Sequence, residues 1–306
     1  MTPLVLAVAA AGALGLSACT TGPGVTTAPT SAPSTSAPAT APAAPAATTA
    51  TVQPSEQRAK PAARALPSAH VHAVSREPST GELLVATHEG LYVYGKGGPR
   101  KVGPDIDLMG FTVAGPRHYY ASGHPGAGVD LPQPAGLLES RDGGRTWTVL
   151  SRGGSSDFHA LTAAGQRVVA FDGTLRLSSG GRSWQTGDLA SPPRTLAISP
   201  DGERVLATTA EGLMSSGDGG ARWKPVAGAP LLLLVDWVDS QAVAGLTPQG
   251  ELHLSTDAGQ TWRATAAVAT DVQALEASRG EGGGVEVVAA THDQLVTSRD
   301  GGPFAE

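Results

Sequence analysis

Cysteine is almost absent from this sequence. The 306 residues include a single one, Cys19, so no intrachain disulfide can form and buried apolar side chains have to stabilise the fold. Basic residues are also scarce, because 21 Lys and Arg stand against 27 Asp and Glu and give a formal net charge of −6. No basic stripe is evident, and phosphate neutralisation needs one, so nucleic acid is not an expected partner.

Charged residues make up 16% of the chain and aromatic residues 4%, whereas glycine occupies 40 positions. Few charges and abundant glycine are typical of many short strands joined by tight turns. The composition therefore predicts an all-β fold.

The apolar run from Leu4 to Leu16 is too short for a membrane-spanning helix, which needs about 20 residues. Its length suits a signal peptide, although no Lys or Arg precedes it. The following Leu16-Ser-Ala-Cys19 resembles the bacterial lipobox. That resemblance implies a lipoprotein signal peptide over residues 1–19, a lipid on Cys19, and export to the membrane surface facing the cell wall or the extracellular space. An ordinary secretory signal with a chance cysteine is the alternative.

Residues 20–66 are rich in Thr, Ala, Pro, Ser and Gly, most purely so up to Pro54. Such a composition cannot bury a core, so we expect a disordered tether between the anchor and the rest of the chain. Residues 67–306 then form one globular domain, and we expect it to be a monomer.

A short motif recurs along the domain at a nearly constant period. It reads S-x-D-x-G-x-T-W in full at residues 140–147 and 255–262, lacks only the Thr at 216–223, and is degenerate at 179–184 and incomplete at 298–302. Trp147, Trp184, Trp223 and Trp262 follow one another every 37 to 39 residues. A repeat of this length is typical of a propeller blade.

The motif resembles the Asp-box, or BNR, repeat of bacterial sialidases, sortilin-type receptors, xyloglucan-cleaving hydrolases and photosystem II assembly factors. Nearly the whole mature chain also resembles secreted bacterial propellers catalogued as glycosylhydrolase-like. The resemblance implies that the box is a structural hairpin between the third and fourth strands of each blade, away from the active face. The residues with this structural role would be Asp142, Trp147, Asp218, Trp223, Asp257, Trp262 and Asp300.

Alternating strand patterns between the boxes give six pairs of inner strands, which predicts a six-bladed β-propeller. A seven-bladed ring fits the pattern less well. The last blade lacks an outermost strand after Gly302, and we expect residues 58–67 to supply it and close the ring.

The start of each inner strand and the end of each second strand open on one face of a propeller. Six of the eight histidines map there, namely His70, His72, His88, His124, His159 and His292. We take His70, His72, Met109, His124, His159 and Arg194 as candidate ligand-binding residues. The glycine- and proline-rich insertion from His124 to Gly136 is where a binding loop or lid would lie.

Three interpretations of this face remain open. The polar groups bond one another and water across the channel, or they bind a glycan or another envelope protein, or His72, His159 and Met109 hold copper or another divalent metal ion. We expect a ligand-binding or scaffold module without certain enzymatic activity.

The alternative is a glycoside hydrolase that uses two of Asp107, Asp157 and Asp271 as its carboxylate pair. Two of these carboxylates facing each other across a cleft would favour the hydrolase, whereas converging histidines would favour binding. A true sialidase is not expected, because only Arg194 among the arginines maps to this face.

Overall fold

The computed structural model describes residues 66–306, and these residues form 23 strands and no helix. None of the described residues therefore forms a helix that could cross a membrane. The proposed signal peptide, Cys19 and residues 20–65 of the linker lie outside the described residues.

The strands form six antiparallel sheets, which follow one another along the chain as blades. Blade one contains β1 (Val71–Arg76), β2 (Leu83–Thr87), β3 (Gly90–Gly95) and β4 (Gly98–Val102). Blade two contains β5 (Ile106–Gly115), β6 (His118–Pro125), β7 (Leu137–Ser140) and β8 (Thr148–Ser151). Blade three contains β9 (Ala160–Ala164), β10 (Arg167–Phe171), β11 (Leu175–Ser179) and β12 (Trp184–Thr186).

The second half of the domain repeats this order, except that the last sheet has three strands. Blade four contains β13 (Thr195–Ile198), β14 (Val205–Thr209), β15 (Gly212–Ser216) and β16 (Lys224–Pro225). Blade five contains β17 (Leu234–Trp237), β18 (Val243–Leu246), β19 (Glu251–Ser255) and β20 (Arg263–Val268). Blade six contains β21 (Ala274–Arg279), β22 (Val285–Ala290) and β23 (Leu295–Arg299).

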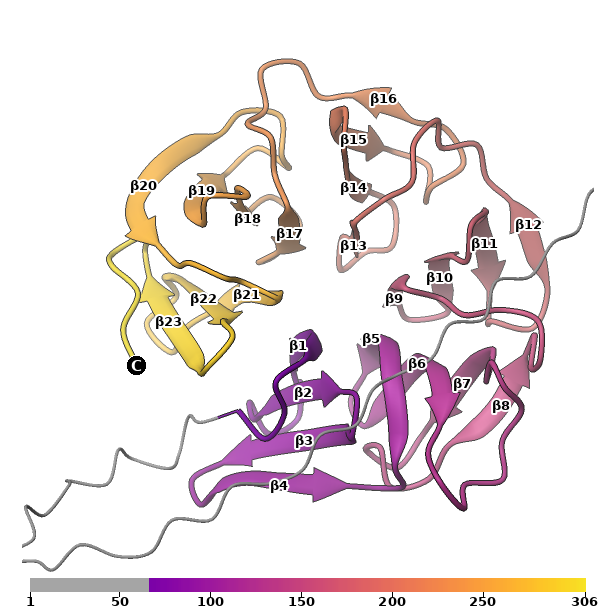
Figure 1. The fold of residues 1–306 in the computed structure, drawn as a ribbon. Helices are drawn as coiled ribbons and strands as arrows, with labels where there is room; N and C mark the ends of the chain where they lie inside the picture. Colours follow the sequence, from indigo (N-terminus) through magenta and orange to yellow (C-terminus); the bar gives the residue numbers. More distant parts are fainter. Residues whose placement is uncertain (1–65) are drawn as a thin grey trace, which may run out of the picture. The chain divides into compact units, whose positions relative to one another are not determined.

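The first strand of each blade faces the centre of a closed ring. Figure 1 shows β1, β5, β9, β13, β17 and β21 around the axis, and each contacts the next, with β21 returning to β1. The predicted all-β, six-bladed propeller is confirmed. The six pairs of inner strands that the alternating pattern predicted are all present.

The boxes at 140–147, 216–223 and 255–262 form the turn expected of them. In blade two, Ser140 Oγ donates to Asp142 Oδ1 at 2.9 Å, while the amide of Thr146 donates to the same oxygen at 3.0 Å. Asp218 and Asp257 accept the matching bonds in blades four and five. Asp300 differs, because it accepts the amide of Val285 instead. Asp142, Asp218 and Asp257 thus close their own hairpins, at the end of each blade opposite the start of its inner strand.

Apolar clusters fill the spaces between blades. Six buried clusters are present among residues 66–306, and each joins two adjacent blades. Trp147 packs on the cluster between blades one and two, where its ring centroid lies 6.5 Å from that of Phe111. Trp184, Trp223 and Trp262 pack on the three following clusters. The box tryptophans therefore act as wedges between blades.

The ring does not close as predicted in the part of residues 58–67 that the structure describes. Leu66 and Pro67 lie in no strand, and Thr297 on the free edge of β23 pairs with Ala305, from the chain's own last residues. Two backbone bonds join this pair, at 2.7 and 2.9 Å. The tail after β23 already occupies that edge, so an N-terminal strand is not needed at Thr297. Residues 58–65 lie outside the described residues.

Candidate functional site

A cavity of about 490 Å³ follows the propeller axis and is lined by the first strands of all six blades. Five of the six predicted ligand-binding residues line it, namely His70, His72, Met109, His159 and Arg194. His124, the sixth, is not part of the lining. None of residues 124–136 lines the cavity, and Val129 and Leu131 of the loop after β6 pack on the core between blades one and two.

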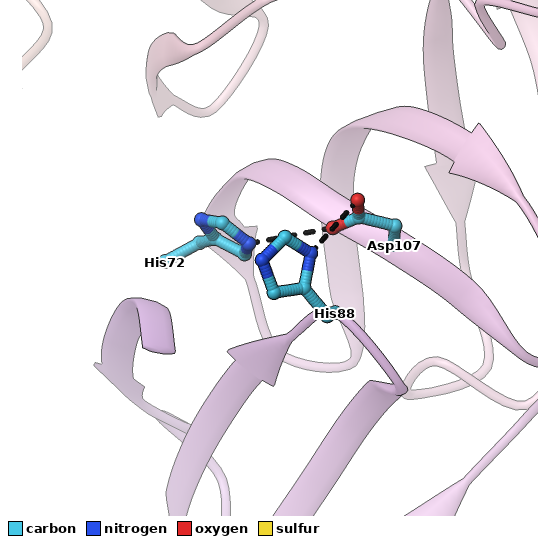
Figure 2. Close-up of side chains that lie close together, drawn as sticks. All are labelled: His72, His88 and Asp107. Carbon is cyan, nitrogen blue, oxygen red and sulfur yellow. Dashed lines mark ion pairs between the residues drawn. The ribbon is translucent and has the colours of Figure 1, made fainter. Parts of the chain in front are cut away.

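Three side chains from two blades meet beside this cavity. Asp107 Oδ1 lies 3.3 Å from His72 Nε2, and Asp107 Oδ2 lies 2.9 Å from His88 Nδ1. The rings of His72 and His88 stand edge to face, with centroids 4.5 Å apart. Figure 2 shows both imidazoles directed at the carboxylate, His88 from the hairpin after β2 and Asp107 from β5.

Irregular strand pairing positions two of these three residues. The register between β1 and β2 shifts between Val71 and Ala73, at His72. The register between β5 and β6 shifts just after Asp107. Such bulges redirect side chains that regular pleating would point elsewhere, and they are common beside functional sites.

Two atoms of this cluster are buried without a hydrogen-bond partner among the described residues. They are His72 Nε2 and Asp107 Oδ1, whose 3.3 Å separation lacks hydrogen-bond geometry. Burial lowers the pKa of His72, and the nearby Asp107 carboxylate opposes this shift without cancelling it. The His72 imidazole is therefore neutral near neutral pH and offers a lone pair.

A second cluster of the same residue types lies one blade further on. Asp157 Oδ2 is 2.7 Å from His159 Nε2 and 3.2 Å from His124 Nε2. Here too a ring nitrogen and a carboxylate oxygen, His124 Nδ1 and Asp157 Oδ1, are buried without a partner. In both clusters a histidine at the end of a second strand meets an aspartate at the start of the next blade.

Blade three does not continue this pairing of a histidine with an aspartate of the next blade. Asp172 directly follows β10, as His88 directly follows β2. Its Oδ2 accepts bonds from Arg176 Nε at 2.7 Å and Ser156 Oγ at 2.5 Å, and Arg152 lies 3.5 Å away. Its own neighbours thus neutralise this carboxylate, which leaves the first two histidine clusters as the distinctive groups of the face.

The three candidate catalytic carboxylates do not share one environment. Asp107 and Asp157 each contact two imidazoles, as described above. Asp271 is exposed, has a positive φ of 54°, and lines a separate depression together with His292. Histidines thus converge at the mouth, which is the arrangement that favours binding.

The sequence predicted that His88 lies on this face, but His88 was not among the candidate ligand-binding residues. Its signal was available, because His88 and His124 both lie at the end of a second strand. What the sequence could not give is the pairing across blades, which depends on the register shifts beside His72 and Asp107.

Another carboxylate lies in the cavity wall. Asp236 on β17 accepts the amides of Trp237 and Ala277, each at 2.9 Å. Burial raises the pKa of Asp236 to about 7, because these two bonds only partly compensate for lost hydration.

The fold and the site define the domain as a six-bladed propeller with a histidine-rich mouth. The sequence matches no family model and no curated protein. Its resemblance to Asp-box proteins therefore remains a resemblance.

Solved structures share the fold. YCF48 bound to D1 peptide is 16% identical, with a TM-score of 0.50 over 78% of this chain and 83% of that one. The GH74 xyloglucanase from Xanthomonas campestris is 17% identical, with a TM-score of 0.52 over 77% of this chain and 45% of that one. A gluconolactonase from the same organism is 10% identical, with a TM-score of 0.58 over 75% and 86%. At such identities the likeness shows the β-propeller fold alone.

Proposed function

We propose that this protein is a lipid-anchored, extracytoplasmic binding module whose ligand occupies the histidine-rich mouth of the cavity. The observation that carries the proposal is the pair of His–Asp–His clusters there, with four buried polar atoms that have no partner among the described residues. An unpartnered buried polar atom costs about 1–3 kcal/mol. A ligand with complementary polar groups would recover that free energy.

The expected ligand is a glycan or a segment of another envelope protein. Imidazole and carboxylate groups pair with the hydroxyls of the first and the amides of the second. One propeller of similar fold is described as bound to a peptide, which supports a polypeptide ligand. The hydrolase alternative, with two of Asp107, Asp157 and Asp271 as its carboxylate pair, stays a prediction.

Membrane attachment through Cys19 is the second part of the proposal, and it rests on the lipobox-like sequence. In fractionated cells, the wild-type chain should stay with the membranes. A Cys19→Ala variant should leave them. Equal distribution of the two chains would contradict the anchor.

Binding is tested with the detergent-solubilised full chain on a glycan array and on an array of envelope-protein peptides. We expect a specific hit on one array, weakened at least about tenfold by the double variant His159→Ala, Arg194→Ala. Both side chains line the cavity. His292→Ala is the matched control, because this exposed histidine lies at the separate depression. No hit on either array, or an equal loss in the control, would contradict the proposal.

A further inference from the structure

We propose that His72, His88 and Asp107 form a binding site for a divalent transition-metal ion of the zinc type. The site lies at the mouth described above, so the inference rests on the proposed function of that mouth. It adds an ion that would hold the ligand there.

The three side chains are close enough to share one ion. Each offers a ligand atom, and these atoms lie within 4.8 Å of one another. Zinc binds nitrogen and carboxylate oxygen at about 2.0–2.1 Å in a tetrahedron, which separates two ligand atoms by about 3.3 Å. His72 Nε2 and Asp107 Oδ1 are 3.3 Å apart. This pair therefore already has the spacing that an ion between them would require.

The unpartnered atoms fit the same explanation. His72 Nε2 and Asp107 Oδ1 are buried, face each other, and make no hydrogen bond with any described residue. The Asp107 carboxylate oxygen presents only lone pairs, and His72 Nε2 presents one when the ring proton is on Nδ1, so in that tautomer the two atoms cannot satisfy each other. A cation between them would satisfy both, whereas an apolar ligand would satisfy neither.

The donor set selects the kind of ion. Two imidazoles and one carboxylate suit zinc and similar borderline ions, whereas calcium and magnesium prefer oxygen ligands throughout. Three protein ligands leave a fourth position for water or for a polar group of the bound ligand. Because His72 lines the cavity, an ion bonded to it would lie where a ligand enters.

The chain contains its own matched control. His124, Asp157 and His159 have the same chemistry one blade further on. Among the described residues, however, only His72, His88 and Asp107 bring three such ligand atoms within 4.8 Å of one another. The two clusters share composition and differ in geometry, so comparing them tests the geometry.

The experiment measures Zn²⁺ binding by the full chain, purified without a histidine tag, stripped with a chelator and titrated calorimetrically. Co²⁺ in place of Zn²⁺ reports tetrahedral coordination through its visible absorption bands. We expect one ion per chain and the absorption of tetrahedral Co²⁺. His88→Ala should weaken binding at least about tenfold, and His124→Ala should leave it unchanged. The side chain of His88 is 40% exposed, so its removal should not disturb the core.

Thermal unfolding in the presence of a chelator checks that each variant folds. If His88→Ala does not fold, Asp107→Asn replaces it, because this substitution keeps the size of the side chain and removes its charge. The metal site is overturned by any of three results. Zn²⁺ does not bind, or neither His88→Ala nor Asp107→Asn weakens its binding, or His124→Ala weakens its binding equally. If Zn²⁺ binding fails while the array ligand still binds, only this inference is overturned. If Zn²⁺ binds as expected and neither array gives a hit, only the proposed function is overturned.

Discussion

Asp236 shows how one residue can link the cavity to pH. Its folded pKa is raised to about 7 by burial, above the ordinary value of 3.8. A raised folded pKa means that Asp236 supports the fold most fully below the unfolded pKa, and that this contribution is lost as pH rises through about 7. We expect Asp236→Ala to destabilise the domain more at pH 5 than at pH 8. The gap in free energy of unfolding between the wild type and the variant should change by up to about 1.4 kcal/mol per pH unit.

Chemical denaturation of both chains at pH 5, 6, 7 and 8 measures this gap. Asp239→Ala is the control. Burial acts to raise the pKa of Asp239, but bonds from the amides of Ala242 and Gln241 and from Arg279 hold it below its usual value. Its contribution is therefore lost only under acid conditions, and its gap should stay flat from pH 5 to pH 8. A flat gap for Asp236→Ala as well would show that Asp236 is hydrated and ordinary.

At the same scale, the sequence predicted which side chains lie on the histidine-rich face, but it did not predict which of them contact each other. Strand alternation placed His72, His88, Asp107 and Asp157 at one face. It could not foresee that β-bulges bring His72 and Asp107 within 3.3 Å. Met109 and His159, the other two predicted metal ligands, line the same cavity as His72, and their role as ligands stays a prediction.

At the scale of the element, the box hairpin depends on several bonds rather than on its aspartate alone. The blade-three hairpin has Ser179 in the place of the aspartate, and it closes with Ser178 Oγ donating to the carbonyl of Ser183 at 2.6 Å. A hairpin that forms without the aspartate implies a modest contribution from each one.

We therefore expect Asp142→Ala to lower the free energy of unfolding by only about 1 kcal/mol at pH 7, since this side chain is largely hydrated. Burial acts to raise the pKa of Asp142, but bonds from Thr146 and Ser140 outweigh it and lower that pKa to about 2. The contribution is thus present above the unfolded pKa and disappears as pH falls toward 2. Urea unfolding at pH 7 and pH 2.5 tests this, with exposed Arg145→Ala as control. A loss above about 3 kcal/mol would mean that the box aspartate is essential to the fold.

For the whole molecule, blade count and order followed from local patterns, but ring closure did not. Each blade is built from neighbouring residues, so its signal is local. The seam between blades six and one joins residues about 200 positions apart. There Gln273 accepts the amide of Val71 at 2.6 Å and donates to the carbonyl of Ala69 at 3.1 Å. An apolar cluster that includes Val74 and Leu295 fills the space behind these bonds.

A buried ion pair completes this seam and carries the last prediction. Arg76 on β1 lies 3.1 Å from Glu276 and 2.9 Å from Glu286, and the side chain of Glu276 is only 5% exposed. Burial raises the pKa of Glu276 even though Arg76 opposes the shift. Arg76→Met leaves this carboxylate buried without its cation, which should cost about 3–5 kcal/mol.

Adding Glu276→Leu to Arg76→Met should restore most of that stability, because the unpaired charge is then gone. Urea unfolding of the wild type and the single and double variants measures both effects. Arg299→Ala is the control, since Arg299 pairs with Glu286 from an exposed position and should matter little. If the double variant were as unstable as Arg76→Met, the seam would depend on the shape of the arginine rather than on charge.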